Sequence, residues 1–133
     1  MQRAFRQYPD AAEIEATARA ALAQLPAVFR EHLSDIVLQV EEFADAQVLA
    51  ELGIADPLDL SGLYEGVPLG DKSIDASGML PDRIRLFRAA LLDEWITRGD
   101  VSLERLVAHV LIHEVGHHFG LSDADMAALE EGA

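Results

Sequence analysis

The segment that decides the fold of this 133-residue chain runs from His109 to Asp123 and reads HVLIHEVGHHFGLSD. Upstream of it, leucine and valine recur at helical spacing after Ser102, so the sequence predicts one helix that begins there and ends at Gly120. A His-Glu-x-x-His motif within the segment places His113 and His117 one turn apart, roughly 6 Å along the axis and about 40° apart around it. Both imidazoles can therefore reach one metal ion.

Three further positions complete the predicted metal site. Glu114 lies about 100° around the helix from His113, too far aside for a ligand but close enough to accept a proton from a metal-bound water. A continuing helix would point Asp123 away from the metal, so the helix must end at Gly120, which reverses the chain and returns the Asp123 carboxylate. We therefore predict one zinc ion held by His113, His117 and Asp123, with Glu114 as general base.

The residue types present in the chain limit the kinds of metal site and of catalysis that it can have. No cysteine is present, which excludes a thiolate metal site, a disulfide framework and a cysteine nucleophile. Histidine and carboxylate also suit iron or manganese, so other divalent metals stay open beside zinc. Two residues are candidates for contacts to the site or the substrate: His109, one turn before His113, and Tyr64, whose phenol could stabilise a tetrahedral oxyanion. The alternatives are a hydrogen-bonded helix histidine and a tyrosine packed in a turn.

The whole chain predicts an α+β fold. Its length predicts one domain spanning residues 1–133, with residues 1–11 as a flexible N-terminal extension. Helical spacing and capping residues predict helices over residues 11–25, 27–33, 44–52 and 102–120, with residues 89–97 helical or irregular and a helix-like stretch after residue 123. Alternating apolar residues predict strands over residues 34–43, 58–64 and 83–88. The last strand is either an edge strand that accepts an extended peptide or an ordinary strand of the sheet.

The charge of the chain is strongly acidic. Ten Lys and Arg stand against 24 Asp and Glu, which gives a formal net charge of -14. This balance opposes binding to nucleic acid or to an anionic membrane surface, and it favours basic or neutral polypeptide segments as partners. The sequence shows neither a run of about 18 apolar residues nor the apolar core of a signal peptide, so we expect a cytoplasmic protein. No feature of the sequence indicates an oligomeric state.

The chain resembles the metzincin clan of zinc peptidases, whose motif is His-Glu-x-x-His-x-x-Gly-x-x-(His/Asp). More closely, it is similar to a bacterial family of minimal metzincins described as zinc metallopeptidases. The resemblance runs from about residue 12 to the C-terminus and is carried by three segments: Gly62–Leu69, Leu80–Ile84 and His113–Gly120. It implies a small mixed sheet packed on the active-site helix, zinc on His113, His117 and Asp123, and Glu114 as base. The methionine turn of the clan does not stand out, since Met126 follows Asp123 by only three residues.

Three functions from different classes follow from these observations. The favoured one is a zinc-dependent peptidase in which Glu114 takes a proton from a metal-activated water. The second is a metal-binding or protein-interaction module of the same fold with weak or no activity. The third is a ribosomal-RNA-processing nuclease, a family with the same histidine spacing. It has glycine at the position of Glu114, however, and the negative charge of this chain opposes RNA.

Overall fold

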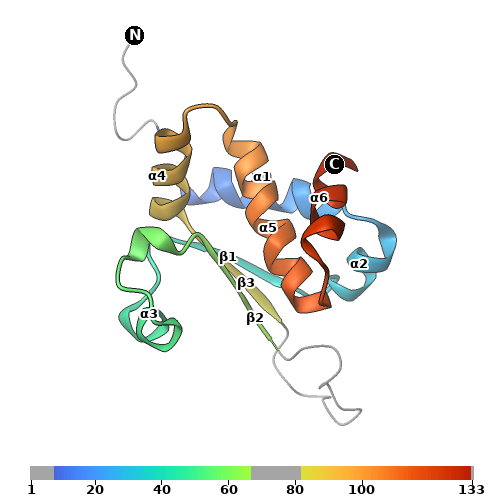
Figure 1. Ribbon diagram of the computed structural model, residues 1–133, viewed down its shortest axis with the longest axis horizontal. Helices are drawn as coiled ribbons and strands as arrows, with labels where there is room; N and C mark the ends of the chain where they lie inside the picture. The colour runs from blue at the N-terminus through green and yellow to red at the C-terminus, as the bar shows by residue number, and fades with distance from the viewer. Residues whose placement is uncertain (1–7, 67–81, 133) are drawn as a thin grey trace.

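The protein contains a three-stranded mixed sheet, one face of which is covered by helices α1 (Ala11–Ala23) and α5 (Leu103–Phe119) (Figure 1). This computed structural model describes residues 8–66 and 82–132. The strands lie in the order β1-β3-β2. Strand β3 pairs in parallel with β1 and antiparallel with β2. Their bounds are β1 (Val37–Glu41), β2 (Gly62–Glu65) and β3 (Arg83–Phe87). Helices with a small mixed sheet confirm the predicted α+β class.

Shorter helices connect and flank these elements. They are α2 (Ala27–His32), α3 (Ala46–Leu52), α4 (Arg88–Arg98) and α6 (Asp123–Gly132), with a 3-10 helix, η2, over Pro57–Asp59. The carboxylates of Asp10 and Asp45 cap α1 and α3, each accepting a backbone N–H bond of 2.8 Å from the third residue of its helix. None of the described helices is long and apolar enough to cross a membrane.

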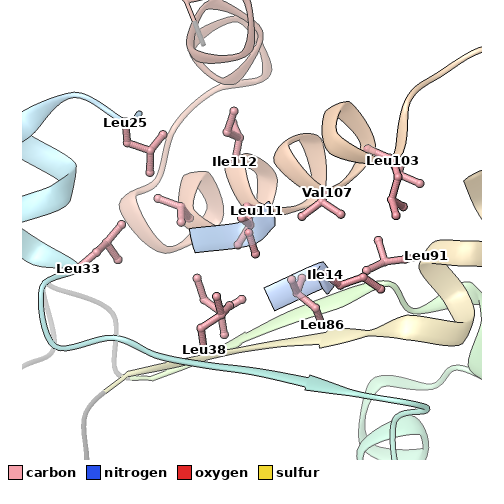
Figure 2. Packing of buried hydrophobic residues seen from close by; sticks show 14 of the residues in the cluster. Ile14, Leu25, Leu33, Leu38, Leu86, Leu91, Leu103, Val107, Leu111 and Ile112 are labelled. Atoms are coloured by element: carbon pink, nitrogen blue, oxygen red, sulfur yellow. The ribbon is translucent and has the colours of Figure 1, made fainter. Parts of the chain in front are cut away.

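The main hydrophobic core lies between the sheet and the helices α1 and α5 (Figure 2). Leu38 of β1 is opposite Ile84 of β3, and Leu86 follows on the same face. Ile14 of α1 and Leu111 of α5 pack against them, and all five side chains are buried. Because protein interiors are close-packed, this contact fixes α5 and its motif relative to the sheet.

Strand β3 is central in the described sheet, so of the two alternatives the ordinary strand is confirmed and the edge strand that accepts a peptide is wrong. The alternation of arginine with apolar residues in β3 is typical of a half-buried strand, yet the side chain of Arg85 is only 7% exposed. The carboxylates of Glu41, Asp45 and Glu65 lie 2.7, 3.4 and 3.5 Å from its guanidinium. These acids belong to other segments of the chain, so the alternation within residues 83–88 could not reveal the burial of Arg85.

The strand predicted over residues 58–64 is also shorter than expected. Its first part forms η2, because the Asp56 carboxylate accepts a 2.9 Å bond from Leu58 N and starts a 3-10 turn. Only Gly62–Glu65 pairs with β3.

For the extension predicted over residues 1–11, residues 1–7 lie outside the described residues. The carbonyl oxygen of Pro9 accepts a 2.7 Å bond from Arg88 Nε, and Ala11 already belongs to α1. Of the described residues in that range, Pro9 and Ala11 therefore belong to the folded structure.

We expect Arg85→Met to lower the free energy of unfolding by about 3 kcal/mol, because the acids around Arg85 would lose their shared buried cation. Urea denaturation followed by circular dichroism measures this change. The matched control is Arg83→Met, since Arg83 also pairs with Glu65 but its side chain is 40% exposed. That exposed pair should contribute less than about 1 kcal/mol. Equal effects of the two substitutions would contradict the prediction.

Candidate metal centre

Helix α5 carries His113, Glu114 and His117 of the predicted site, and hydrogen bonds define where it begins and ends. The Ser102 hydroxyl accepts a 3.2 Å bond from Arg105 N at the start of the helix. At its end, Gly120 adopts φ 71°, a left-handed conformation that favours glycine. Gly120 N–H donates to His117 O at 3.3 Å, and Leu121 N–H donates to Gly116 O at 2.8 Å. This pair of bonds forms a Schellman motif, so the chain reversal predicted at Gly120 is confirmed.

Three histidines of α5 form a stripe at intervals of one turn. The ring centroids of His109 and His113 are 4.2 Å apart, and those of His113 and His117 are 6.4 Å apart with the rings nearly perpendicular at 86°. His109 and His113 are half-buried, whereas His117 is exposed. The stripe therefore presents imidazole nitrogens over two helical turns, with His113 in the middle.

Glu114 lies between this helix and the edge of the sheet. Its Oε1 accepts a 2.9 Å bond from the backbone N–H of Tyr64 in β2. Burial raises the pKa of the Glu114 carboxyl above its ordinary value, against the lowering effects of the Tyr64 N–H and of His117. A carboxylate that is partly withdrawn from water is a stronger proton acceptor than an exposed one, and the bond at Oε1 holds the Glu114 side chain in place.

The side chain of Tyr64 belongs to a polar cluster with Asp82 and His118. The phenol of Tyr64 donates a 2.8 Å bond to Asp82 Oδ2, and its ring stacks on His118 at a centroid distance of 4.3 Å. His118 Nε2 lies 3.5 Å from the same Asp82 oxygen. Burial and the bond to Asp82 raise the pKa of Tyr64 well above its ordinary value, so the phenol stays protonated. Tyr64 thus meets Glu114 through its backbone and not through its phenol.

Asp123 is the first residue of α6 and is exposed. Ser122 caps the helix beside it, accepting a 3.1 Å bond from Asp125 N. In the described residues, the ligand atoms of His113, His117 and Asp123 do not all lie within 4.8 Å of one another. Asp123 therefore follows directly after the chain reversal, and the ligand set of His113, His117 and Asp123 stays a prediction.

Met126 of α6 packs against Gly116, which lies within the His-Glu-x-x-His motif. It is buried, and a Cβ placed on Gly116 would lie 2.7 Å from its Cγ. Gly116 therefore provides the space that lets α6 approach α5. A methionine packed against α5 at the motif was not expected from the sequence, because the spacing from Asp123 to Met126 is short.

We expect Gly116→Val to destabilise the protein by about 2 kcal/mol, since the added side chain collides with Met126 in a packed interior. Thermal unfolding of the single and double variants measures the effect. A second substitution, Met126→Ala, should relieve the collision, so that the double variant is more stable than the sum of the two single changes implies. Strict additivity would show that Gly116 and Met126 do not constrain each other.

A second group of potential ligands lies one turn toward the start of α5. His109, His113 and Glu130 of α6 offer ligand atoms that all lie within 4.8 Å of one another, the one such group in the part of the chain that the structure describes. His109 Nδ1 and Glu130 Oε1 are in direct contact. Glu130 was not predicted from the sequence. The sequence feature that could have indicated Glu130 is its spacing of seven residues from Asp123, because this spacing puts both carboxylates on one side of α6.

A helix with a His-Glu-x-x-His motif, packed on a small mixed sheet, defines a zincin-type protein. Residues 33–133 match the model of the family described as Zincin-like metallopeptidase. The match covers most of the chain, which therefore belongs to this family, and the resemblance found in the sequence is confirmed. The name of this family indicates a zinc metallopeptidase, a class of hydrolase that acts on polypeptides. A comparison with curated protein sequences gave no significant match.

Proposed function

We propose that the protein is a zinc-dependent peptidase with Glu114 as general base and with His113, His117 and Asp123 as metal ligands. The observation that carries this proposal is the environment of Glu114, which is half-buried next to His113 and held at Oε1 by the Tyr64 N–H. A carboxylate in this position could accept a proton from a water molecule bound to a metal ion, and the adjacent histidine stripe is where such an ion would be held.

The donor set fits zinc. Two imidazoles and a carboxylate, with no thiolate in the chain, are typical of open catalytic zinc sites and not of closed structural ones. When bound, zinc would supply Lewis-acid chemistry that polarises the scissile carbonyl and acidifies water.

Glu114 performs the proton transfers in this scheme. The Tyr64 N–H engages Oε1, and we assign proton transfer to Oε2. The carboxylate accepts a proton from the attacking water and later returns it to the leaving amine. Burial raises the pKa of Glu114, which strengthens it as a base while keeping it able to release the proton.

Strand β2, and not β3, is the strand we assign to the substrate. In the described sheet β2 is the edge strand that contacts α5, and it holds Glu114 through Tyr64. An extended polypeptide beside β2 would run past the general base. The net charge of -14 favours basic or neutral segments over acidic ones.

The test is incubation of the zinc-loaded protein with a diverse peptide library, with cleavage products identified by mass spectrometry. Cleavage by the wild type that Glu114→Gln abolishes would support the peptidase and reveal its preference. If neither protein cleaves any peptide, the proposed peptidase is overturned in favour of a metal-binding module without useful activity.

The ligand assignment of Asp123 has its own prediction. In a Glu130→Gln background, which removes the second group of potential ligands, Asp123→Ala should lower zinc affinity by roughly 100-fold, because a carboxylate ligand is replaced by water. Competition with a chromophoric zinc chelator measures the affinity. Asp125→Ala is the matched control, since Asp125 is also exposed in the first turn of α6 but caps Ser122 N. Unchanged affinity in Asp123→Ala would remove Asp123 from the ligand set.

A further inference from the structure

We propose that His109, His113 and Glu130 form a second metal site, which takes a borderline divalent cation such as Zn²⁺ and competes with the first site for His113. Its ligand atoms already lie within 4.8 Å of one another. The site itself needs only these three residues, whereas the competition rests on the proposed function of His113.

The antiparallel packing of α5 and α6 produces this arrangement. After the reversal at Gly120, α6 folds back along α5 (Figure 1). Met126 meets Gly116, and Glu130 meets His109, so higher numbers on α6 face lower numbers on α5. This order shows that the two helices run in opposite directions.

The spacing along the two helices is matched. Asp123 and Glu130 are about 10 Å apart along α6, and His117 and His109 are about 12 Å apart along α5. One carboxylate is therefore available at each end of the histidine stripe. His113, in the middle, lies beside His109 and Glu130 in the structure and also belongs to the predicted set with His117 and Asp123.

The chemistry and exposure of the second group suit a metal ion. Two imidazoles and a carboxylate make a three-ligand zinc set with a place for water. The side chains of His109 and Glu130 are 44% and 28% exposed, so an ion can enter from solvent. Glu130 also lines a groove of about 930 Å³ between α1, α5 and α6. The acidic net charge further raises the local concentration of cations.

Sharing of His113 makes the two sites exclusive. A neutral imidazole has one nitrogen with a free lone pair, because the other nitrogen carries the proton. His113 can therefore bind one ion at a time. An ion held by His109 and Glu130 withdraws His113 from His117 and Asp123, so occupation of the second site would inhibit hydrolysis.

The experiment isolates the second site by removing the two ligands that belong only to the first. His117→Ala/Asp123→Ala should still bind one Zn²⁺ per chain in competition with a chromophoric chelator. Adding Glu130→Gln to this background should lower the affinity about 100-fold. The matched control is Glu131→Gln, an exposed neighbour that lines the same groove. Circular dichroism of every variant verifies the fold.

Two results would overturn the inference. One is a folded His117→Ala/Asp123→Ala variant that binds no zinc, and the other is an equal affinity in the Glu130→Gln and Glu131→Gln backgrounds. Simultaneous binding of two ions by the wild type would overturn the sharing of His113. Failure of the proposed peptidase is distinguishable from these results, because it appears as absent cleavage by both the wild type and Glu130→Gln, in which the second site cannot inhibit, while zinc binding through His109 and Glu130 persists in His117→Ala/Asp123→Ala.

Discussion

Replacing Glu114 with glutamine should lower kcat/KM for peptide hydrolysis by roughly 100- to 10,000-fold, the range that a positioned general base contributes. Glutamine keeps the shape of the side chain, and its carbonyl oxygen can still accept the bond from the Tyr64 N–H, so the fold should be unchanged. An amide cannot take a proton from water at neutral pH. The loss should therefore appear in kcat and leave zinc affinity intact.

Steady-state kinetics on a cleaved library peptide, together with zinc affinity, measures both parts of this prediction. Glu104→Gln is the matched control, because Glu104 is an exposed residue in the first turn of the same helix. It should retain wild-type kinetics. Substantial hydrolysis by Glu114→Gln, with bound zinc, would assign the base to another group.

The second large effect is expected from His113→Ala. His113 belongs to the predicted zinc set and to the group with His109 and Glu130, so its loss leaves neither set with three protein ligands. We expect zinc affinity to fall by about 100-fold or more. Hydrolysis should disappear at micromolar zinc for the same reason.

Zinc competition assays and metal content after dialysis measure this loss. The control is His32→Ala, because His32 is an exposed residue of α2 outside the histidine stripe. A His113→Ala protein that keeps wild-type zinc affinity would show that the metal binds elsewhere in the chain.

Local features of the sequence predicted most of the helices. Asp10 before Glu13 predicted the start of α1, and the structure has both bonds of a capping box there. Ser102 and Gly120 predicted both ends of α5. These signals lie within a few residues of the backbone groups that they satisfy, so a single sequence is enough to read them.

The strands were predicted less well. Alternation located β3 correctly but not its central position, because its neighbours are β1, far earlier in the chain, and β2, which precedes residues 67–81. The burial of Arg85 has the same origin. Its three acidic partners come from other segments, and only the sheet register and the start of α3 bring them together.

The sequence by itself determined the chemistry of this protein: a histidine stripe on one helix, a glutamate beside it, a glycine that ends the helix and no cysteine. Only the tertiary structure decided which groups meet. It brought the Tyr64 N–H to Glu114 across 50 positions of sequence and Glu130 to His109 across 21. The physical reason is that helix periodicity and capping act over one or two turns, whereas these contacts arise when remote elements bury their apolar faces against each other.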